Sequence, residues 1–217
     1  MGKFSLHGTK YINEEGNRVP SVTTIISQHL GWNKNALLAW TKRMMLGGQD
    51  SDKVLNEAGD IGTLLHLLIE GHQQGFDVDT KDYSYNQEKA AMKAFAGYLQ
   101  WYEKVKFKSL ANELVLVSEE MQVGGTIDSI GKMGDDLVVV DWKTSKYLYA
   151  ENKIQLSAYC YMYEQAQPKA KISHGLVMRF GKDDGKFHQH VIKREKLETG
   201  IEIFKALVKI SQLKSQL

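Results

Sequence analysis

Two aspartates and one lysine form the group in this sequence most suggestive of chemistry. Asp128 is the last residue of the run Gly124–Asp128. Twelve residues separate it from Asp141-Trp142-Lys143, and the last of these twelve form an apolar run. Two neighbouring carboxylates repel each other unless a cation lies between them, and hard oxygen ligands favour Mg²⁺ or Mn²⁺. A lysine beside the metal can orient water or neutralise charge that develops on a phosphate. The spacing therefore indicates metal-assisted chemistry on a phosphate.

A β-hairpin would bring these groups together. The runs Gly124–Asp128 and Leu137–Ser145 are typical of strands, and Lys132–Asp136 between them is a turn rich in Gly and Asp. Because side chains alternate along a strand, Asp141 and Lys143 share a face. Pairing can then place Asp128 beside Asp141. The alternative is an ordinary hairpin whose exposed end carries a surface ion pair.

The longer string that contains these residues resembles a known family. Gly-Gly-Thr-Ile-Asp, followed by Val-Asp-Trp-Lys-Thr-Ser, is similar to the signature of the PD-(D/E)XK nuclease superfamily. Within it, the string resembles the RecB-type exonuclease branch, which includes phage exonucleases and the mitochondrial genome maintenance exonuclease. The resemblance runs from about Pro20 to Tyr163. It implies an α/β fold with a restriction-endonuclease-like core, in which a central mixed β-sheet is flanked by helices and joined to an α-helical N-terminal part.

The resemblance also implies roles for individual residues. It implies that Mg²⁺ or Mn²⁺ is held by His66, Asp128, Asp141 and the backbone carbonyl of Trp142. Lys143 would then position or activate the attacking water.

His66 and Glu70 lie four residues apart in an apolar helical stretch and so share a helix face. The branch carries a metal-binding histidine in a Gly-x-x-x-His-x-x-x-Glu helix, which favours His66 as a ligand. A satisfied core histidine is the alternative. Glu70 has the weaker case, as a group that orients His66 or a basic partner.

Further residues are candidates for positioning the site or the substrate. Gln155 and Tyr159 resemble the Gln-x-x-x-Tyr motif of the branch, which helps to position the active site or DNA; a core tyrosine is the alternative. Ser21 is a predicted helix N-cap, and free amides and hydroxyls there could also hold a DNA phosphate. The possible DNA contacts are Ser21, Thr23, Thr144 and Ser145.

Hydrophobic periodicity and turn residues predict the surrounding elements. Helices are expected from Pro20–Ser21 onward and over 33–46, 52–72, 84–107, 151–165 and 195–213, with strands in a hairpin at 3–19 and over 112–121, 172–180 and 187–192. We expect one nuclease domain over 1–217. It would comprise a mostly helical part (1–110), the sheet and catalytic core (111–195) and a C-terminal helix (196–217).

Several aromatic and charged residues allow two interpretations. Trp32 and Trp40 could stack on unpaired bases, but tryptophan at helical spacing is more often core. Glu119 or Glu120 could reach the metal, although a solvated strand edge is the better interpretation. His188 and His190 alternate onto one strand face that we expect to be solvated.

Composition narrows the class of protein. The chain has 217 residues, 42% hydrophobic and 25% charged, as in ordinary globular proteins, and a net charge of only +2, so any basic surface must be local. The single Cys160 excludes an internal disulfide framework and an all-cysteine site, and no iron–sulfur cluster is expected. No apolar run approaches eighteen residues and no signal peptide is evident, so a cytoplasmic protein without membrane partners is expected.

Together these features predict a divalent-metal-dependent DNA nuclease. An exonuclease of DNA replication, repair or recombination is expected, acting on single-stranded DNA or free ends, with replication or recombination proteins as possible partners. A catalytically silent DNA-binding module on the same fold and a sequence-specific endonuclease remain as alternatives. An adaptor protein would give no reason for Asp128, Asp141 and Lys143 to converge.

Overall fold

The computed structural model describes residues 9–217. The elements in chain order are β1 (Tyr11–Ile12), β2 (Arg18–Val19), α1 (Val22–His29), α2 (Lys34–Leu46), α3 (Ser51–Gln74), α4 (Tyr85–Val105), β3 (Lys108–Ser118), β4 (Val123–Met133), β5 (Asp136–Lys143), α5 (Ala150–Ala166), β6 (His174–Phe180), β7 (Phe187–Lys193) and α6 (Arg194–Lys214). The part of the first hairpin expected before residue 9 lies outside the described residues.

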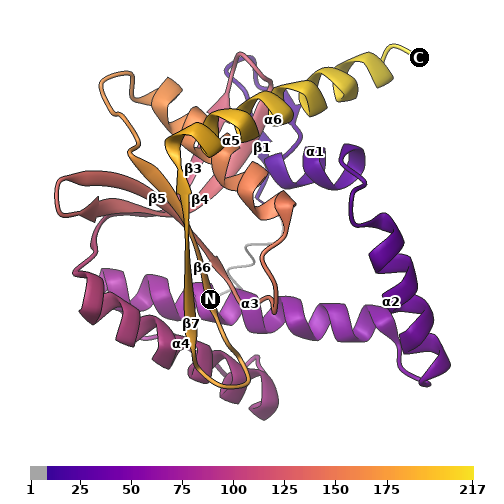
Figure 1. Cartoon of the computed structure of the whole chain (residues 1–217), viewed down its shortest axis with the longest axis vertical. Helices are drawn as coiled ribbons and strands as arrows, with labels where there is room; N and C mark the ends of the chain where they lie inside the picture. The colour runs from indigo at the N-terminus through magenta and orange to yellow at the C-terminus, as the bar shows by residue number, and fades with distance from the viewer. Residues whose placement is uncertain (1–8) are drawn as a thin grey trace.

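A mixed five-stranded sheet forms the centre of the fold. Its order is β3-β4-β5-β6-β7, with β5 and β6 parallel and the other neighbours antiparallel. The parallel pair requires a crossover, and α5 provides it. Helices α5 and α6 lie on one face of the sheet, and α3 and α4 on the other (Figure 1). The predicted α/β fold, with its mixed sheet flanked by helices, is confirmed.

Each face of the sheet carries its own hydrophobic core. On the α5–α6 side, Val139, Val177 and Ile192 pack with Leu156 and Phe204. On the α3–α4 side, the alternate strand residues pack against α4. The largest buried side chains lie in this core: Tyr98 and Trp101 from α4, Trp142 from β5 and Phe180 from β6. Burial of both faces explains why β5 is a continuous apolar run. The strand therefore has only its carboxyl end free for polar groups.

Local sequence signals set several helix ends. Ser21 caps α1 by accepting a hydrogen bond from the Thr24 amide at 3.0 Å, as predicted. Ser84 and Gln87 form a capping box at the start of α4. Gly75 ends α3 in the left-handed conformation, with φ of 77°. Asp50, which accepts from the Asp52 and Lys53 amides, and Gly75 fix the two ends of α3, which carries His66 in its second half.

Helix α2 stands apart from the rest of the fold. None of its residues is buried, and it packs mainly on α3. In Figure 1 it forms the right-hand margin between α1 and α3. Trp40 on α2 is half-buried, and Trp32 in the preceding loop is 59% exposed. The prediction that the two tryptophans are core residues is therefore wrong.

Across the described residues 9–217, no helix has the length and apolarity needed to cross a bilayer.

Candidate active site

The predicted hairpin brings Asp128 next to Asp141-Trp142-Lys143. Strands β4 and β5 pair antiparallel with Ser129 opposite Val140, and the next positions in this register are Asp128 and Asp141. The Trp142 amide donates a hydrogen bond of 2.8 Å to Asp128 Oδ2. This bond fixes the Asp128 carboxylate at the end of β5, while Oδ1 remains for other partners.

Helix α3 delivers His66 to the same place. His66 Nε2 lies 3.0 Å from the Trp142 carbonyl oxygen, and Nδ1 lies 3.7 Å from Asp128 Oδ1. In the tautomer that carries hydrogen on Nε2, the ring donates to the carbonyl and turns its Nδ1 lone pair toward the carboxylate. A backbone carbonyl that accepts from one ring nitrogen is the usual way to orient a metal-binding histidine. The Trp142 carbonyl, predicted as a ligand, here orients His66.

Glu113 completes the group, and sequence reasoning missed it. Its Oε1 lies 3.5 Å from His66 Nδ1. On β3 it falls between the register pairs Asn112–Ser129 and Leu114–Ile127, directly opposite Asp128. Ligand atoms of His66, Glu113 and Asp128 all lie within 4.8 Å of one another.

The backbone at Glu113 explains why strand alternation did not reveal it. Its φ is 47°, in the left-handed region that non-glycine residues in a strand rarely adopt. A register shift between Ser109 and Ala111 further disturbs the alternation of β3. Glu119 and Glu120, the acidic residues considered from sequence, instead accept hydrogen bonds from the Glu14 amide and the Tyr161 hydroxyl. The interpretation that they belong to the strand edge agrees with these contacts.

Asp141 and Lys143 form a close ion pair beside this group. Lys143 Nζ donates to Asp141 Oδ1 at 2.7 Å, and the Asp141 side chain is only 1% exposed. Burial raises the pKa of Asp141 to about 6, despite the opposing effect of Lys143. Its second oxygen, Oδ2, is buried without a hydrogen-bond partner among the described residues. An unpartnered buried carboxylate oxygen is costly unless something binds it.

The electrostatics of His66 follow from its carboxylate neighbours. Burial alone would lower the pKa of His66, but Asp128 and Glu113 outweigh it and raise the pKa to about 9. Burial also raises the pKa of Asp128, against the effect of His66 and Lys143. In the metal-free protein, a protonated His66 therefore occupies the place where a cation is favoured.

This set of donors fits a divalent metal ion. Ligands about 2.1 Å from an octahedral ion lie about 3.0 Å apart when adjacent and about 4.2 Å apart when opposite. The separations of 3.5 and 3.7 Å from His66 Nδ1 to Glu113 and Asp128 fall in this range. Carboxylate oxygens with a single imidazole suit Mg²⁺ or Mn²⁺ better than a thiolate-seeking metal. The free Oδ2 of Asp141 offers one more oxygen.

Tyr159 and Gln155 support the site from α5. Gln155 Nε2 donates to the Tyr159 hydroxyl at 3.0 Å. Burial raises the pKa of Tyr159 well above its ordinary value, and Asp128 adds to this effect. A Cβ on Gly125 would lie 2.6 Å from the Tyr159 ring, and one on Gly124 would lie 2.1 Å from the Tyr11 ring. The two glycines therefore give the aromatic rings room against β4.

The remaining predicted residues lie around this group. Thr144 reaches α3 near Gly62, one helical turn before His66. The Ser145 hydroxyl donates to the Tyr147 carbonyl. Ser21 bonds to the hydroxyls of Thr23 and Thr24, and its backbone bridges to Gly124 of β4.

Glu70 accepts a hydrogen bond from Gln74 and makes no contact with His66 among the interactions of the described chain. Its predicted role in orienting His66 has no support from this arrangement.

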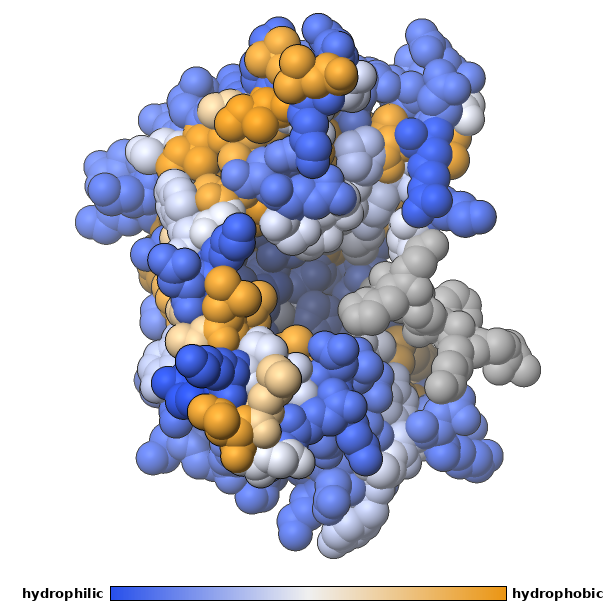
Figure 2. Space-filling view, turned by 90° about the vertical axis from the view of Figure 1, so that its right-hand side faces the viewer, coloured by the Kyte–Doolittle hydropathy of each residue, from blue (hydrophilic) through white to orange (hydrophobic). Residues whose placement is uncertain are grey.

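The face seen in Figure 2 is hollowed at its centre, and the floor of the hollow is coloured hydrophilic. The hollow lies below the level of α1 and α6 and above the level of α3 and α4 in Figure 1. Hydrophobic patches surround it above and below. A polar recess of this kind suits an extended, charged substrate better than an apolar one.

Two solved structures are among those to which this chain is similar. A proposed exonuclease from Eubacterium rectale is 12% identical, with a TM-score of 0.48, over 67% of this chain and 64% of that one, so this chain spans less than two thirds of that protein. An alkaline exonuclease from Laribacter hongkongensis is 11% identical, with a TM-score of 0.37, over 71% of this chain and 82% of that one. No curated protein matches the sequence.

A family assignment comes from the sequence itself. Residues 36–215 match the PD-(D/E)XK nuclease superfamily, and this match covers most of the chain. It includes His66, Glu113, Asp128, Asp141 and Lys143. The chain therefore belongs to the PD-(D/E)XK nuclease superfamily.

Proposed function

We propose that this protein is a DNA exonuclease that uses Mg²⁺ or Mn²⁺ to hydrolyse phosphodiester bonds. The observation that carries the proposal is the convergence of His66, Glu113 and Asp128, from three separate elements, beside the Asp141–Lys143 pair. The RecB-type string at Gly124–Ser145 supports exonucleolytic action in replication, repair or recombination. We also propose that residues 1–217 work as one nuclease domain, since α3 and the sheet both contribute to the donor set.

In this proposal each residue has a separate task. Asp128, Asp141 and Glu113 supply oxygen ligands and His66 supplies nitrogen. A bound divalent ion would act as a Lewis acid on the scissile phosphate and lower the pKa of an attacking water. The Trp142 backbone holds this arrangement together, because its amide donates to Asp128 and its carbonyl accepts from His66.

Lys143 acts as a cation and hydrogen-bond donor. Burial would lower its pKa, but Asp141 and Asp128 outweigh burial and raise the pKa above its ordinary value. Lys143 therefore stays protonated at neutral pH in the metal-free protein. Its ammonium group orients the water and offsets negative charge that grows on the phosphate in the transition state. Gln155 and Tyr159 hold the face of β4 from which Asp128 projects.

The test is cleavage of end-labelled DNA, single-stranded and duplex, with Mg²⁺, Mn²⁺, Ca²⁺ or a chelator. We expect Mg²⁺ or Mn²⁺ to support cleavage and Ca²⁺ to support binding alone, since Ca²⁺ is larger and tolerates irregular geometry. Covalently closed circular DNA distinguishes the modes of attack. An exonuclease leaves it intact, whereas cleavage of circles would favour the endonuclease alternative. Hydrolysis that persists in excess chelator would contradict the metal mechanism.

Asp141→Asn provides the internal control for the residue assignment. It retains the shape of the side chain and removes the charged oxygen that is buried without a partner. We expect DNA binding without cleavage. Full activity of Asp141→Asn would exclude this site, and absence of cleavage by the parent protein under all metal conditions would favour the catalytically silent module.

A further inference from the structure

A row of basic side chains continues from Lys143 across the sheet. In the register of β5, β6 and β7, Lys143 lies beside Arg179, and Arg179 lies beside His188. One pleat earlier, Asp141 lies beside Val177, and Val177 beside His190. Partners in register share a face, so Arg179, His188 and His190 lie on the face that carries the catalytic pair. Neighbouring strands are about 4.8 Å apart, so the row extends about 10 Å from Lys143.

Lys143 is paired with Asp141, but four other basic residues of the described chain lie together without such a partner: Arg179, His188, His190 and Lys153 of α5. Burial lowers the pKa of His190, and the nearby Arg179, His188 and Lys153 lower it further. His190 Nε2 is buried and has no hydrogen-bond partner in the described residues. Within residues 9–217, none of the four basic residues forms a salt bridge with a carboxylate. The positive charges of Arg179 and Lys153, which have no carboxylate partner among the described residues, favour an anion from outside the chain.

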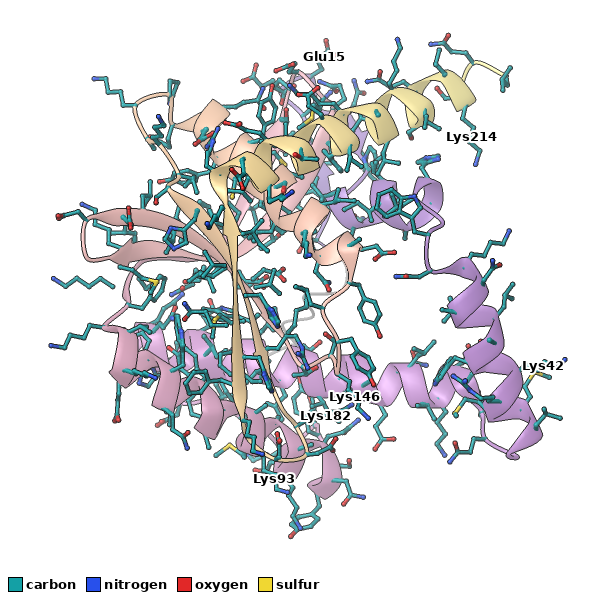
Figure 3. The ribbon with its side chains drawn as sticks, in the orientation of Figure 1. Glu15, Lys42, Lys93, Lys146, Lys182 and Lys214 are labelled. Atoms are coloured by element: carbon teal, nitrogen blue, oxygen red, sulfur yellow. The ribbon has the colours of Figure 1, made fainter. Side chains whose placement is uncertain are left out.

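Arg179 also ties this patch to the catalytic strand. Its Nε donates to the Ser145 carbonyl at 3.0 Å, and its terminal nitrogen donates to the Lys146 carbonyl. The loop that follows Lys143 is thereby fastened to β6. Figure 3 labels Lys146 on this loop and Lys182 on the loop after β6, both at the same end of the sheet. The patch and the catalytic lysine are therefore parts of one rigid surface.

We propose that Arg179, His188, His190 and Lys153 form a subsite for a DNA phosphate next to the scissile one. The proposal rests on the proposed function, because it extends the path of the same strand beyond Lys143. Two imidazoles and the Arg179 N–H groups that do not bond to the Ser145 and Lys146 carbonyls offer several donors to one phosphate. The subsite would hold the strand in register while Lys143 acts on the neighbouring phosphate.

The test measures DNA binding by fluorescence anisotropy in Ca²⁺, across a range of salt concentrations. The main variant is the double substitution Lys153→Ala/His188→Ala, since both side chains are exposed and their removal leaves the core intact. Loss of one phosphate contact reduces the slope of log affinity against log salt by about 0.7 for a single strand. Relative to 1 M salt, this corresponds to about fivefold weaker binding at 0.1 M.

Lys193→Ala is the matched control. Lys193 is exposed on the same strand, but alternation turns it to the opposite face from His188 and His190. We expect its affinity and salt slope to equal those of the parent. Arg179→Lys serves as the second variant, because it keeps the charge and loses the fork. We expect it to bind about as weakly as the double variant.

Oligonucleotides with and without a 5′-phosphate identify the phosphate. If the double variant loses equal affinity for both oligonucleotides, the subsite binds an internal phosphodiester. If it loses affinity only for the phosphorylated oligonucleotide, the subsite binds a terminal phosphate. Either result supports the subsite. An unchanged salt slope in the double variant, or an equal loss in Lys193→Ala, would overturn it. The two proposals fail separately: a parent that binds DNA without cleaving it refutes the nuclease, and one that cleaves while the double variant binds normally refutes the subsite alone.

Discussion

Metal binding should release a proton from His66, and the affinity for metal should therefore rise with pH. The pKa of His66 in the metal-free protein is about 9, but only a neutral imidazole can bind a metal ion. At pH 7.0 about 1% of the protein has His66 deprotonated, and at pH 8.5 about 24%. The apparent affinity for Mn²⁺ should consequently increase about 25-fold over this range.

Asp141 and Lys143 leave most of this pH window clear, and a proton on Asp128, whose pKa burial also raises, would be lost with the same sign. Asp141, with a pKa of about 6, is already ionised through most of it. The pKa of Lys143 is raised above its ordinary value, so Lys143 remains protonated throughout. The sign therefore depends on His66: its proton competes with the metal at low pH and is lost as pH rises toward 9. At pH 7.0 this competition costs about 2.7 kcal/mol of binding free energy.

Isothermal titration calorimetry under anaerobic conditions provides the measurement. Titrations at pH 7.5, in two buffers with different ionisation enthalpies, count the protons released per Mn²⁺ bound. We expect about one for the parent and none for His66→Ala, whose affinity should be weaker at pH 8.5 and independent of pH. If the parent releases no proton and its affinity is flat from pH 7.0 to 8.5, His66 is not a ligand and the reasoning is refuted.

Three further substitutions test the separate tasks of the site. Lys143→Ala should retain metal and DNA binding and lose roughly 10²–10³-fold in the rate of single-turnover cleavage; a near-parental rate would show that the lysine is only a surface charge. Glu113→Gln should weaken Mn²⁺ binding at least about tenfold by calorimetry. Glu120→Gln is its control, because Glu120 follows β3 but bonds to Tyr161, and this variant should bind Mn²⁺ like the parent. Tyr159→Phe removes the hydroxyl that accepts from Gln155 and should cost about 1 kcal/mol in denaturant unfolding while lowering cleavage; unchanged cleavage would make the tyrosine a core residue alone.

The sequence predicted those parts of the site that depend on regular geometry. Asp141 and Lys143 share a face because they are two apart on a strand, and Asp128 meets them because a short turn fixes the register of the hairpin. The six helices and the strands β3 and β5 to β7 were likewise predictable from periodicity and caps, with β3 starting at Lys108 instead of 112. The strand predicted over Gly124–Asp128 extends over Val123–Met133, so the turn predicted over Lys132–Asp136 is confined to Gly134 and Asp135.

Glu113 and Trp32 show where such prediction stops. Glu113 depends on a left-handed residue in a strand, which no apolar or polar alternation signals. Its neighbour His66 comes from a helix 47 residues earlier, so their 3.5 Å approach exists only in the folded chain. Trp32 is of a residue type that is usually buried, yet it is exposed in the loop between α1 and α2. Tertiary packing decides whether this side chain is buried, and the helix propensity of the sequence gives no information about tertiary packing.

The isolated position of α2 has a consequence for local unfolding. With no buried residue and contacts mainly to α3, the helix adds little hydrophobic stabilisation of its own. Thirteen residues are also near the lower limit at which a helix persists without tertiary support. Its amide hydrogens should therefore exchange through a low-energy opening, long before those of α5, which open only with the whole sheet. A protease that requires an unfolded segment would cut first within Lys34–Leu46 and leave the metal-binding group assembled.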